Sequence, residues 1–196
     1  MLTFNSIFSN PIILKHLITF KDIGFRSVER SDVDLIRDEH NREPILLMLR
    51  DPSIVNETMQ NKWFESITAS RNNTVFIIFH KDPAKAIGVW KLQGLDDVNR
   101  CTELGMDIFS GYRGKGFGLK SFHMIFKYLF ESLNIHTVYA KVGEYNEVSL
   151  AAAQKAGFRI NGKIRESLFR KGRYWDNIVL DITLDDYKIL AKKHKL

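Results

Sequence analysis

The stretch from Leu104 to Leu133 constrains the fold of this chain more than any other. Residues 104–109 alternate apolar side chains with small or polar ones, which predicts a β-strand. Residues 111–118 then carry four glycines. Residues 122–133 repeat large apolar side chains at helical spacing, which predicts an amphipathic helix with one wide apolar face. The order is therefore strand, glycine-rich turn, helix.

The glycine-rich turn has the composition of an anion-binding loop. Glycines tolerate positive φ angles and let a ligand approach the backbone closely. The free N–H groups and the positive dipole end of the following helix attract an anion, and Arg113 and Lys115 add positive charge. The turn therefore predicts a site for a phosphate or pyrophosphate; a glycine-rich turn without a ligand is the alternative. A dinucleotide-binding fingerprint is disfavoured because the third glycine comes one residue early, and no Walker loop is present.

Length and composition indicate one soluble domain. We divide the 196 residues into an N-terminal extension, 1–20, and a single domain, 21–196. A single cysteine excludes an internal disulfide and fits a reducing compartment, so we expect a cytoplasmic protein. We find no apolar run long enough to cross a membrane and no signal peptide. The net charge of +6 comes without a basic block, so we expect no nucleic-acid partner, and no Cys/His cluster predicts a metal.

The remaining pattern predicts an α/β fold with a mixed sheet. The strands between residues 74 and 109 follow one another through short turns, which favours antiparallel pairing. The strand at 136–142 follows a helix crossover, so we expect it to lie parallel to the strand before the glycine loop. The expected strands cover residues 23–28, 74–80, 86–95, 101–109, 136–142, 160–168 and 174–184.

Two motifs in order resemble the GNAT superfamily of acetyl-CoA-dependent N-acetyltransferases. The run Arg113-x-x-Gly116-x-Gly118 resembles the R/Q-x-x-G-x-G/A loop of that superfamily. Downstream, Asn146-x-x-Ser149 followed by residues 155–158 (KAGF) resembles its second signature, N-x-x-[SA]…K-x-GF. Residues 162–176 look like the RimJ/RimL branch, and the whole resemblance covers roughly residues 23–187.

The resemblance implies the GNAT acyl-CoA N-acyltransferase fold: a mixed, mostly antiparallel twisted sheet of about six to seven strands with helices on both faces. The strand ending at Phe109 and the strand 136–142 would splay apart to admit the pantetheine arm of acetyl-CoA. The pyrophosphate would lie on the amides of residues 113–118. The implied cofactor-binding residues are Met106, Ile108, Phe109, Arg113, Gly114, Lys115, Gly116, Phe117, Gly118, Asn146 and Ser149. For Asn146 a helix N-cap is an equal alternative.

The implied reaction moves an acetyl group to a primary amine by direct attack in a ternary complex. It needs a neutral amine, a polarised thioester and a proton for the departing thiolate. Glu103 is the candidate base; an ion-paired or solvent-facing strand carboxylate is its alternative reading. The tyrosine that often supplies the proton in this superfamily is replaced by Ala153, so Ser149 and Tyr145 become the candidate acids. A non-catalytic acyl-CoA-binding module on the same fold is the alternative function.

The sequence leaves the amine acceptor open. A protein N-terminus, a polyamine and an aminosugar, alone or linked to a nucleotide, all meet the same chemical need. Basic and aromatic residues near the C-terminus favour a nucleotide-linked aminosugar if their side chains face the cleft; they are Arg165, Arg170, Lys171, Arg173 and Trp175. A homodimer is one assembly that we allow for.

Overall fold

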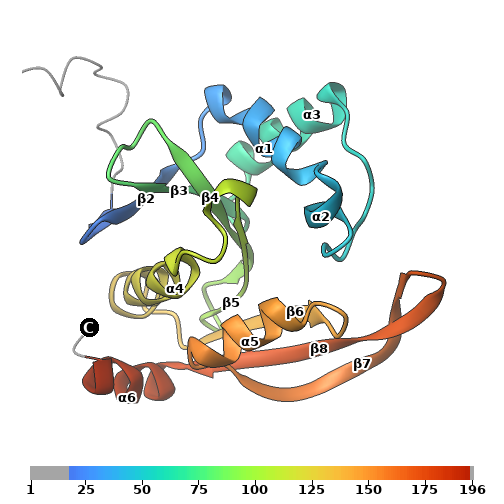
Figure 1. Ribbon diagram of the computed structural model, residues 1–196. Helices are drawn as coiled ribbons and strands as arrows, with labels where there is room; N and C mark the ends of the chain where they lie inside the picture. Colours follow the sequence, from blue (N-terminus) through green and yellow to red (C-terminus); the bar gives the residue numbers. More distant parts are fainter. Residues whose placement is uncertain (1–17, 195–196) are drawn as a thin grey trace, which may run out of the picture.

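The computed structural model describes residues 18–194, which form one mixed eight-stranded sheet with helices on both faces (Figure 1). The strand order is β1-β2-β3-β4-β5-β6-β8-β7. The strands are β1 (Ile18–Phe20), β2 (Ile23–Ser27), β3 (Thr74–His80), β4 (Ala86–Asp96), β5 (Cys101–Ile108), β6 (Thr137–Gly143), β7 (Arg159–Arg170) and β8 (Arg173–Thr183). The helices are α1 (Val33–His40), α2 (Glu43–Leu46), α3 (Glu57–Ala69), α4 (Phe117–Lys127), α5 (Glu147–Lys155) and α6 (Leu184–His194).

The predicted sheet is confirmed, with one additional strand. Among the described residues, seven strands match the ones expected from the sequence, and β1 adds an eighth. Because β1 pairs with β2, the sheet begins three residues before the boundary that we expected at residue 21. The rest of the expected extension, residues 1–17, lies outside the described residues. All neighbouring pairs are antiparallel except β5 and β6, which are parallel as expected.

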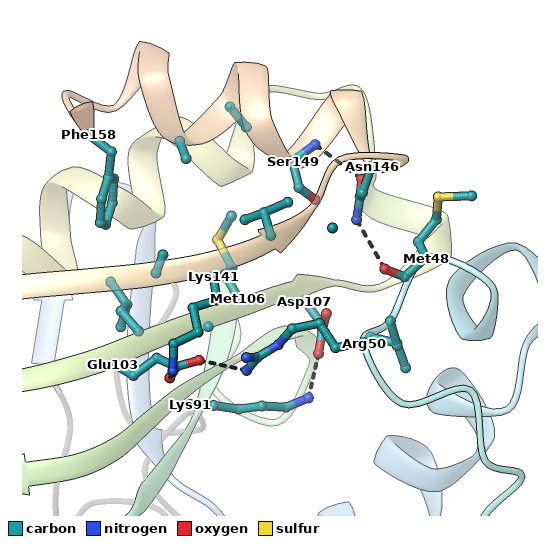
Figure 2. A pocket seen from close by; sticks show the side chains of 18 of the residues that line it. Met48, Arg50, Lys91, Glu103, Met106, Asp107, Lys141, Asn146, Ser149 and Phe158 are labelled. Atoms are coloured by element: carbon teal, nitrogen blue, oxygen red, sulfur yellow. Dashed lines mark hydrogen bonds and ion pairs between the residues drawn. The ribbon is translucent and has the colours of Figure 1, made fainter. Parts of the chain in front are cut away.

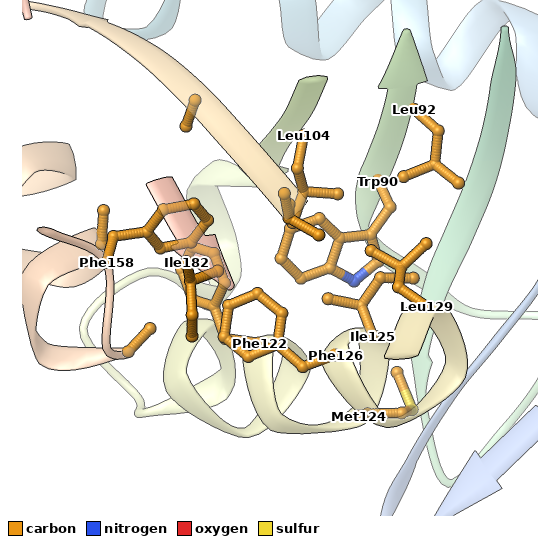
Figure 3. Close-up of a cluster of buried hydrophobic side chains, with 14 of the residues drawn as sticks. Trp90, Leu92, Leu104, Phe122, Met124, Ile125, Phe126, Leu129, Phe158 and Ile182 are labelled. Atoms are coloured by element: carbon orange, nitrogen blue, oxygen red, sulfur yellow. The ribbon is translucent and has the colours of Figure 1, made fainter. Parts of the chain in front are cut away.

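Alternation along the central strands builds a core on each face of the sheet. Ile78 of β3 and Trp90 of β4 belong to the larger cluster, together with the aromatic face of α4. Figure 3 shows Trp90 packed against Phe122 and Ile125 of α4. Their neighbours Ile77 and Val89 point to the other face and pack with α1 and α3. The sheet therefore separates two helical layers: α1 to α3 cover one face and α4 and α5 the other (Figure 1).

The chain between β5 and β6 differs from the expected uninterrupted helix. The α-helical part, α4, ends at Lys127, and a π-helical turn from Tyr128 to Ser132 follows.

At one edge of the sheet, β7 and β8 form a long hairpin whose two-residue turn, Lys171-Gly172, has positive φ at both positions. Such a turn matches the right-handed twist of the paired strands.

We predict that acid weakens the fold partly through His123 on α4. Burial, followed by the nearby positive charges of His194 and Lys21, lowers the pKa of His123 below its usual value of 6.5. The unfolded chain then binds this proton more readily, so stability is present above the usual pKa and is lost as pH falls through it. The free energy of unfolding, measured in urea, should fall from about pH 7.5 to about pH 5.5. His123→Gln should reduce that fall, whereas the exposed His136→Gln should not; equal pH dependence in all three proteins would contradict the prediction.

Candidate active site

A cleft opens where the parallel strands β5 and β6 separate. The two strands pair only between Cys101–Glu103 and Thr137–Tyr139, so β5 has no strand partner on this side from Leu104 onward. The opening is a cavity of about 180 Å³ (Figure 2). Its walls come from β4, β5, β6, α5 and the segment 48–50, with Phe122 of α4 and Phe158 at the apolar end.

The two faces of β5 give the cleft two chemically different sides. Leu104 is buried in the apolar cluster under α4, and Met106 Cε lies 3.4 Å from where a Cβ atom on Gly118 would be. Glu103 and Asp107 alternate with these residues and face the opposite side. The register between β4 and β5 is unbroken from Glu103 to Ile108, so no bulge at Gly105 changes this alternation. The cleft is thus apolar toward α4 and charged toward the α1–α3 layer.

Five charged side chains gather on the second side. Glu103 is buried, and its Oε1 accepts a hydrogen bond from Arg50 Nη2 at 2.6 Å while its Oε2 accepts one from Lys141 Nζ at 2.9 Å. Asp107 accepts a hydrogen bond from Lys91 Nζ at 2.6 Å (Figure 2). Glu103 is therefore an ion-paired carboxylate in the structure, which is the alternative that the sequence left open beside a catalytic base. Each carboxylate oxygen that accepts one of these bonds has a second lone pair and can accept another hydrogen bond.

The glycine loop presents unpaired amides beyond the end of β5. Gly114 and Gly116 have φ angles of +73° and +80°, and Gly116 is the N-cap of α4. Within residues 18–194, the N–H groups of residues 113–118 make no hydrogen bond to protein, and the loop is largely exposed. Arg113 Nε donates to Ile108 O and Lys115 Nζ to Gly111 O, which keeps both cations beside the loop. Free amides, a helix N-terminus and two cations fit the diphosphate expected here.

The residues of the second motif divide between the cleft and its support. Ser149 lines the cleft, and its N–H donates to Asn146 Oδ1 at 3.2 Å, so Asn146 is the N-cap of α5. Asn146 Nδ2 donates to Met48 O at 3.3 Å. Tyr145 is not among the cleft-lining residues; its hydroxyl donates to Leu49 O at 3.0 Å, and burial raises the pKa of that hydroxyl. Asn146 and Tyr145 thus hold residues 48–50.

Residues Met48–Arg50, here called the bridging segment, close one end of the cleft. They join the helical layer around α2 to the C-terminal half through Asn146, Tyr145 and Arg170, whose Nη2 also donates to Leu49 O. Arg170 is buried, and Trp175 Nε1 donates to Arg170 O. None of the basic and aromatic C-terminal residues that would have favoured a nucleotide-linked aminosugar is among the described cleft-lining residues. Arg170 and Trp175 support the bridging segment instead, and Arg173 stacks on Trp175.

Only some of the site residues expected from the sequence line the cleft in the described part of the chain. Glu103, Met106, Asn146 and Ser149 line one cleft. Ile108 and Phe109 do not line it; Phe109 is buried and its N–H donates to Ile87 O. The sequence reading missed the cleft cations, which are Arg50, Lys91 and Lys141. Lys91 and Lys141 lie on the strands on either side of β5, so a known strand register would have placed them near Glu103. Arg50 lies outside the sheet, and no pattern in the neighbouring sequence indicates that it reaches Glu103.

Two negative findings apply to residues 18–194. No group of three or more His, Cys, Asp or Glu side chains is arranged to hold a metal ion in this part of the chain. None of its helices combines the length and apolar character needed to cross a membrane.

Comparison with known proteins gives consistent matches. The family model described as "Acetyltransferase (GNAT) domain" matches residues 22–159. An uncharacterized prophage-derived N-acetyltransferase of Bacillus subtilis, YokL, is 25% identical over 87% of this chain and 95% of its own length. The spermidine N(1)-acetyltransferase of Vibrio cholerae is 26% identical over 79% of this chain and 88% of its own. A crystal structure of the V. cholerae spermidine N-acetyltransferase with CoA and spermine superimposes with a TM-score of 0.79, at 22% identity over 86% of this chain and 99% of that one. At this identity the structural match shows the fold.

Proposed function

Because this chain belongs to the GNAT acetyltransferase family and is an acyltransferase that uses acetyl-CoA, we propose that it acetylates a primary amine by direct attack in a ternary complex. The acceptor nitrogen enters from the charged side of the cleft, and the thioester lies between β5 and β6. The observation that supports this proposal best is the cleft itself. It opens where β5 loses its partner, and the unpaired amides of residues 113–118 lie just beyond the same strand.

The reaction forms one N–C bond and breaks one C–S bond. The amine nitrogen loses a proton and the sulfur gains one, so no net proton is consumed. We propose that Glu103 accepts the proton from the amine, directly or through one water, using a lone pair that Arg50 and Lys141 leave free. The amides of the glycine loop and Arg113 bind the diphosphate, and Met106 packs against the start of α4 beside the cleft. Acetyl-CoA supplies the activated acetyl group.

We propose that Ser149, rather than Tyr145, protonates the departing thiolate. Ser149 lines the cleft, whereas Tyr145 is not among the described cleft-lining residues and its hydroxyl already donates to Leu49 O. Ala153, where many relatives have tyrosine, lines the cleft and offers no proton.

We predict that Ser149→Ala lowers the kcat of thiol release by about 100-fold, the low end of what a positioned acid contributes. Tyr145→Phe should leave kcat within about threefold, because it removes a support of the bridging segment and no reacting group. Initial rates of CoA release at saturating acetyl-CoA measure both. A larger loss in Tyr145→Phe than in Ser149→Ala would reverse the assignment.

We also propose that the protein belongs to the RimJ/RimL branch and is located in the cytoplasm. The C-terminal motif at 162–176 supports a RimJ/RimL-like enzyme, and the single cysteine supports a cytoplasmic location. The proposed acceptor is a protein N-terminus, a polyamine or an aminosugar, alone or linked to a nucleotide. The similarity to the V. cholerae spermidine acetyltransferase favours the polyamine. The charges of the cleft do not favour it, because both carboxylates of the described lining, Glu103 and Asp107, are already paired with cations of the protein.

Thiol release with three amines tests the proposal. Purified protein is mixed with acetyl-CoA and one N-terminal peptide, one polyamine or one UDP-linked aminosugar, and CoA formation is followed. We expect saturable turnover with at least one of them and a mass gain of one acetyl group on the amine. Binding of acetyl-CoA without turnover on any amine would contradict the proposed reaction and favour the non-catalytic module.

A further inference from the structure

The acceptor side of the cleft carries more positive than negative charge. Its charged residues among those described are three cations, Arg50, Lys91 and Lys141, and two carboxylates, Glu103 and Asp107. Lys91 and Asp107 form a one-to-one pair, with Nζ and Oδ2 2.6 Å apart. Glu103 alone faces two cations, one on each oxygen. One positive charge beside the candidate base is therefore uncompensated.

Arg50 is the residue best placed to offer that charge to a substrate. Its side chain is 39% exposed, whereas the Glu103 side chain that it contacts is 10% exposed. Only Nη2 of its guanidinium makes a hydrogen bond within residues 18–194, so the remaining N–H donors have no protein partner there. A planar guanidinium with free donors binds a carboxylate or a phosphate in a bidentate way. Arg50 also sits on the bridging segment, which closes the end of the cleft.

The same arrangement opposes a polycation. Every carboxylate oxygen that could attract a second ammonium group in the cleft already has a lysine or arginine partner, except one oxygen of Asp107. A polyamine would bring further positive charge to a side that has an excess of it. An acceptor with an anion near its amine would instead complete the charge balance around Glu103.

On the basis of the proposed function, we propose that the natural acceptor is a small primary amine bearing a carboxylate or phosphate, and that Arg50 binds this anion. The amine lies at Glu103, and the anion replaces solvent at the free donors of Arg50. Lys141 keeps the second oxygen of Glu103 paired while the acceptor is bound.

Matched amines that differ in one anionic group test this inference. The pairs are β-alanine with β-alaninamide, for the carboxylate, and O-phosphoethanolamine with ethanolamine, for the phosphate; spermidine is the polycation. The value of kcat/KM is expressed per unprotonated amine, because only that form attacks. We expect the anionic member of at least one pair to exceed its neutral partner by about tenfold or more, and to exceed spermidine. The ratio of anionic to neutral kcat/KM is then compared between the two pairs. A larger ratio for β-alanine indicates a carboxylate, and a larger ratio for O-phosphoethanolamine indicates a phosphate.

Two variants assign the preference to a residue. Arg50→Gln should lower the ratio of anionic to neutral kcat/KM by about tenfold, mainly through KM. Arg71→Gln, which removes an exposed arginine in the turn before β3, should leave the ratio unchanged. Acetyl-CoA affinity, measured by calorimetry, reports whether each variant is folded.

The outcomes separate the two proposals. Turnover that is fastest with spermidine or a neutral amine would overturn the inference and leave the proposed function in place. An anionic preference that survives in Arg50→Gln would overturn the role of Arg50. Binding of acetyl-CoA with no turnover on any of these five amines, on the N-terminal peptide or on the UDP-linked aminosugar would overturn the proposed function and the inference with it.

Discussion

Gly116→Glu should weaken acetyl-CoA binding by about 100-fold or more, equal to about 2.7 kcal/mol, with little binding left to measure at ordinary protein concentrations. Two effects combine. The substitution places a negative charge at the N-cap of α4, where unpaired amides and the helix dipole would otherwise favour an anion. It also puts a side chain at φ +80°, a conformation that favours glycine. Calorimetric titration with acetyl-CoA measures the loss.

Gly172→Glu is the matched control for this experiment. Gly172 also has a left-handed φ, +76°, and at both positions an added Cβ atom would meet nothing within 4 Å. Gly172 lies at the tip of the β7–β8 hairpin, away from the glycine loop (Figure 1). The two variants therefore share the backbone strain and the added charge, and they differ only in place. Equal affinity loss in both would show that the amides of residues 113–118 do not bind the diphosphate.

Glu103→Gln should lower the kcat of acetyl transfer by between about 100-fold and about 10,000-fold, the range for removal of a positioned acid or base. Glutamine keeps the size of the side chain and one oxygen for Arg50 or Lys141, but it cannot accept a proton from the amine. Affinity for acetyl-CoA should not change, because the glycine loop lies beyond the other end of β5. Single-turnover rates of CoA release separate this chemical step from binding.

Asp107→Asn is the comparison that separates a base from an ion pair. Asp107 lies on the same strand and the same face, and it pairs with a lysine at a similar distance. Its loss removes an ion pair near the acceptor but no proposed proton acceptor, so kcat should fall by less than about tenfold. If the two variants lose activity equally, the ionic cluster as a whole, rather than the Glu103 carboxylate, supports the reaction.

Local patterns in the sequence predicted most of the sheet and one side of the cleft. Alternation and turn residues marked seven of the eight strands among the described residues, and the helix crossover predicted the parallel pair β5–β6. The register with β4 places Glu103 and Met106 on opposite faces of β5, in keeping with the alternation of side chains along this strand. The eighth strand, Ile18–Phe20, is short and gains its identity from pairing with β2, so its own residues carry little signal.

The other side of the cleft depends on contacts between distant residues. Arg50 meets Glu103 across 53 positions in the chain, and Tyr145 meets Leu49 across 96. Spacing along one strand or helix contains no information about such pairs. The same limit explains why the sequence left open whether Arg170 and Trp175 face the cleft; in the structure they support the bridging segment.

The strict alternation along β5 has a consequence for how the chain can change over generations. Leu104 and Met106 serve the apolar side of the cleft, and Glu103 and Asp107 serve the charged side, all within five consecutive positions. Side chains on this short strand can be exchanged one at a time. Gaining or deleting a single codon inside it would turn every following side chain to the wrong face, burying carboxylates under α4 and exposing leucine to the amine. We therefore infer that lineages of this enzyme vary β5 by substitution and accept length changes in the turn that precedes it, between β4 and β5.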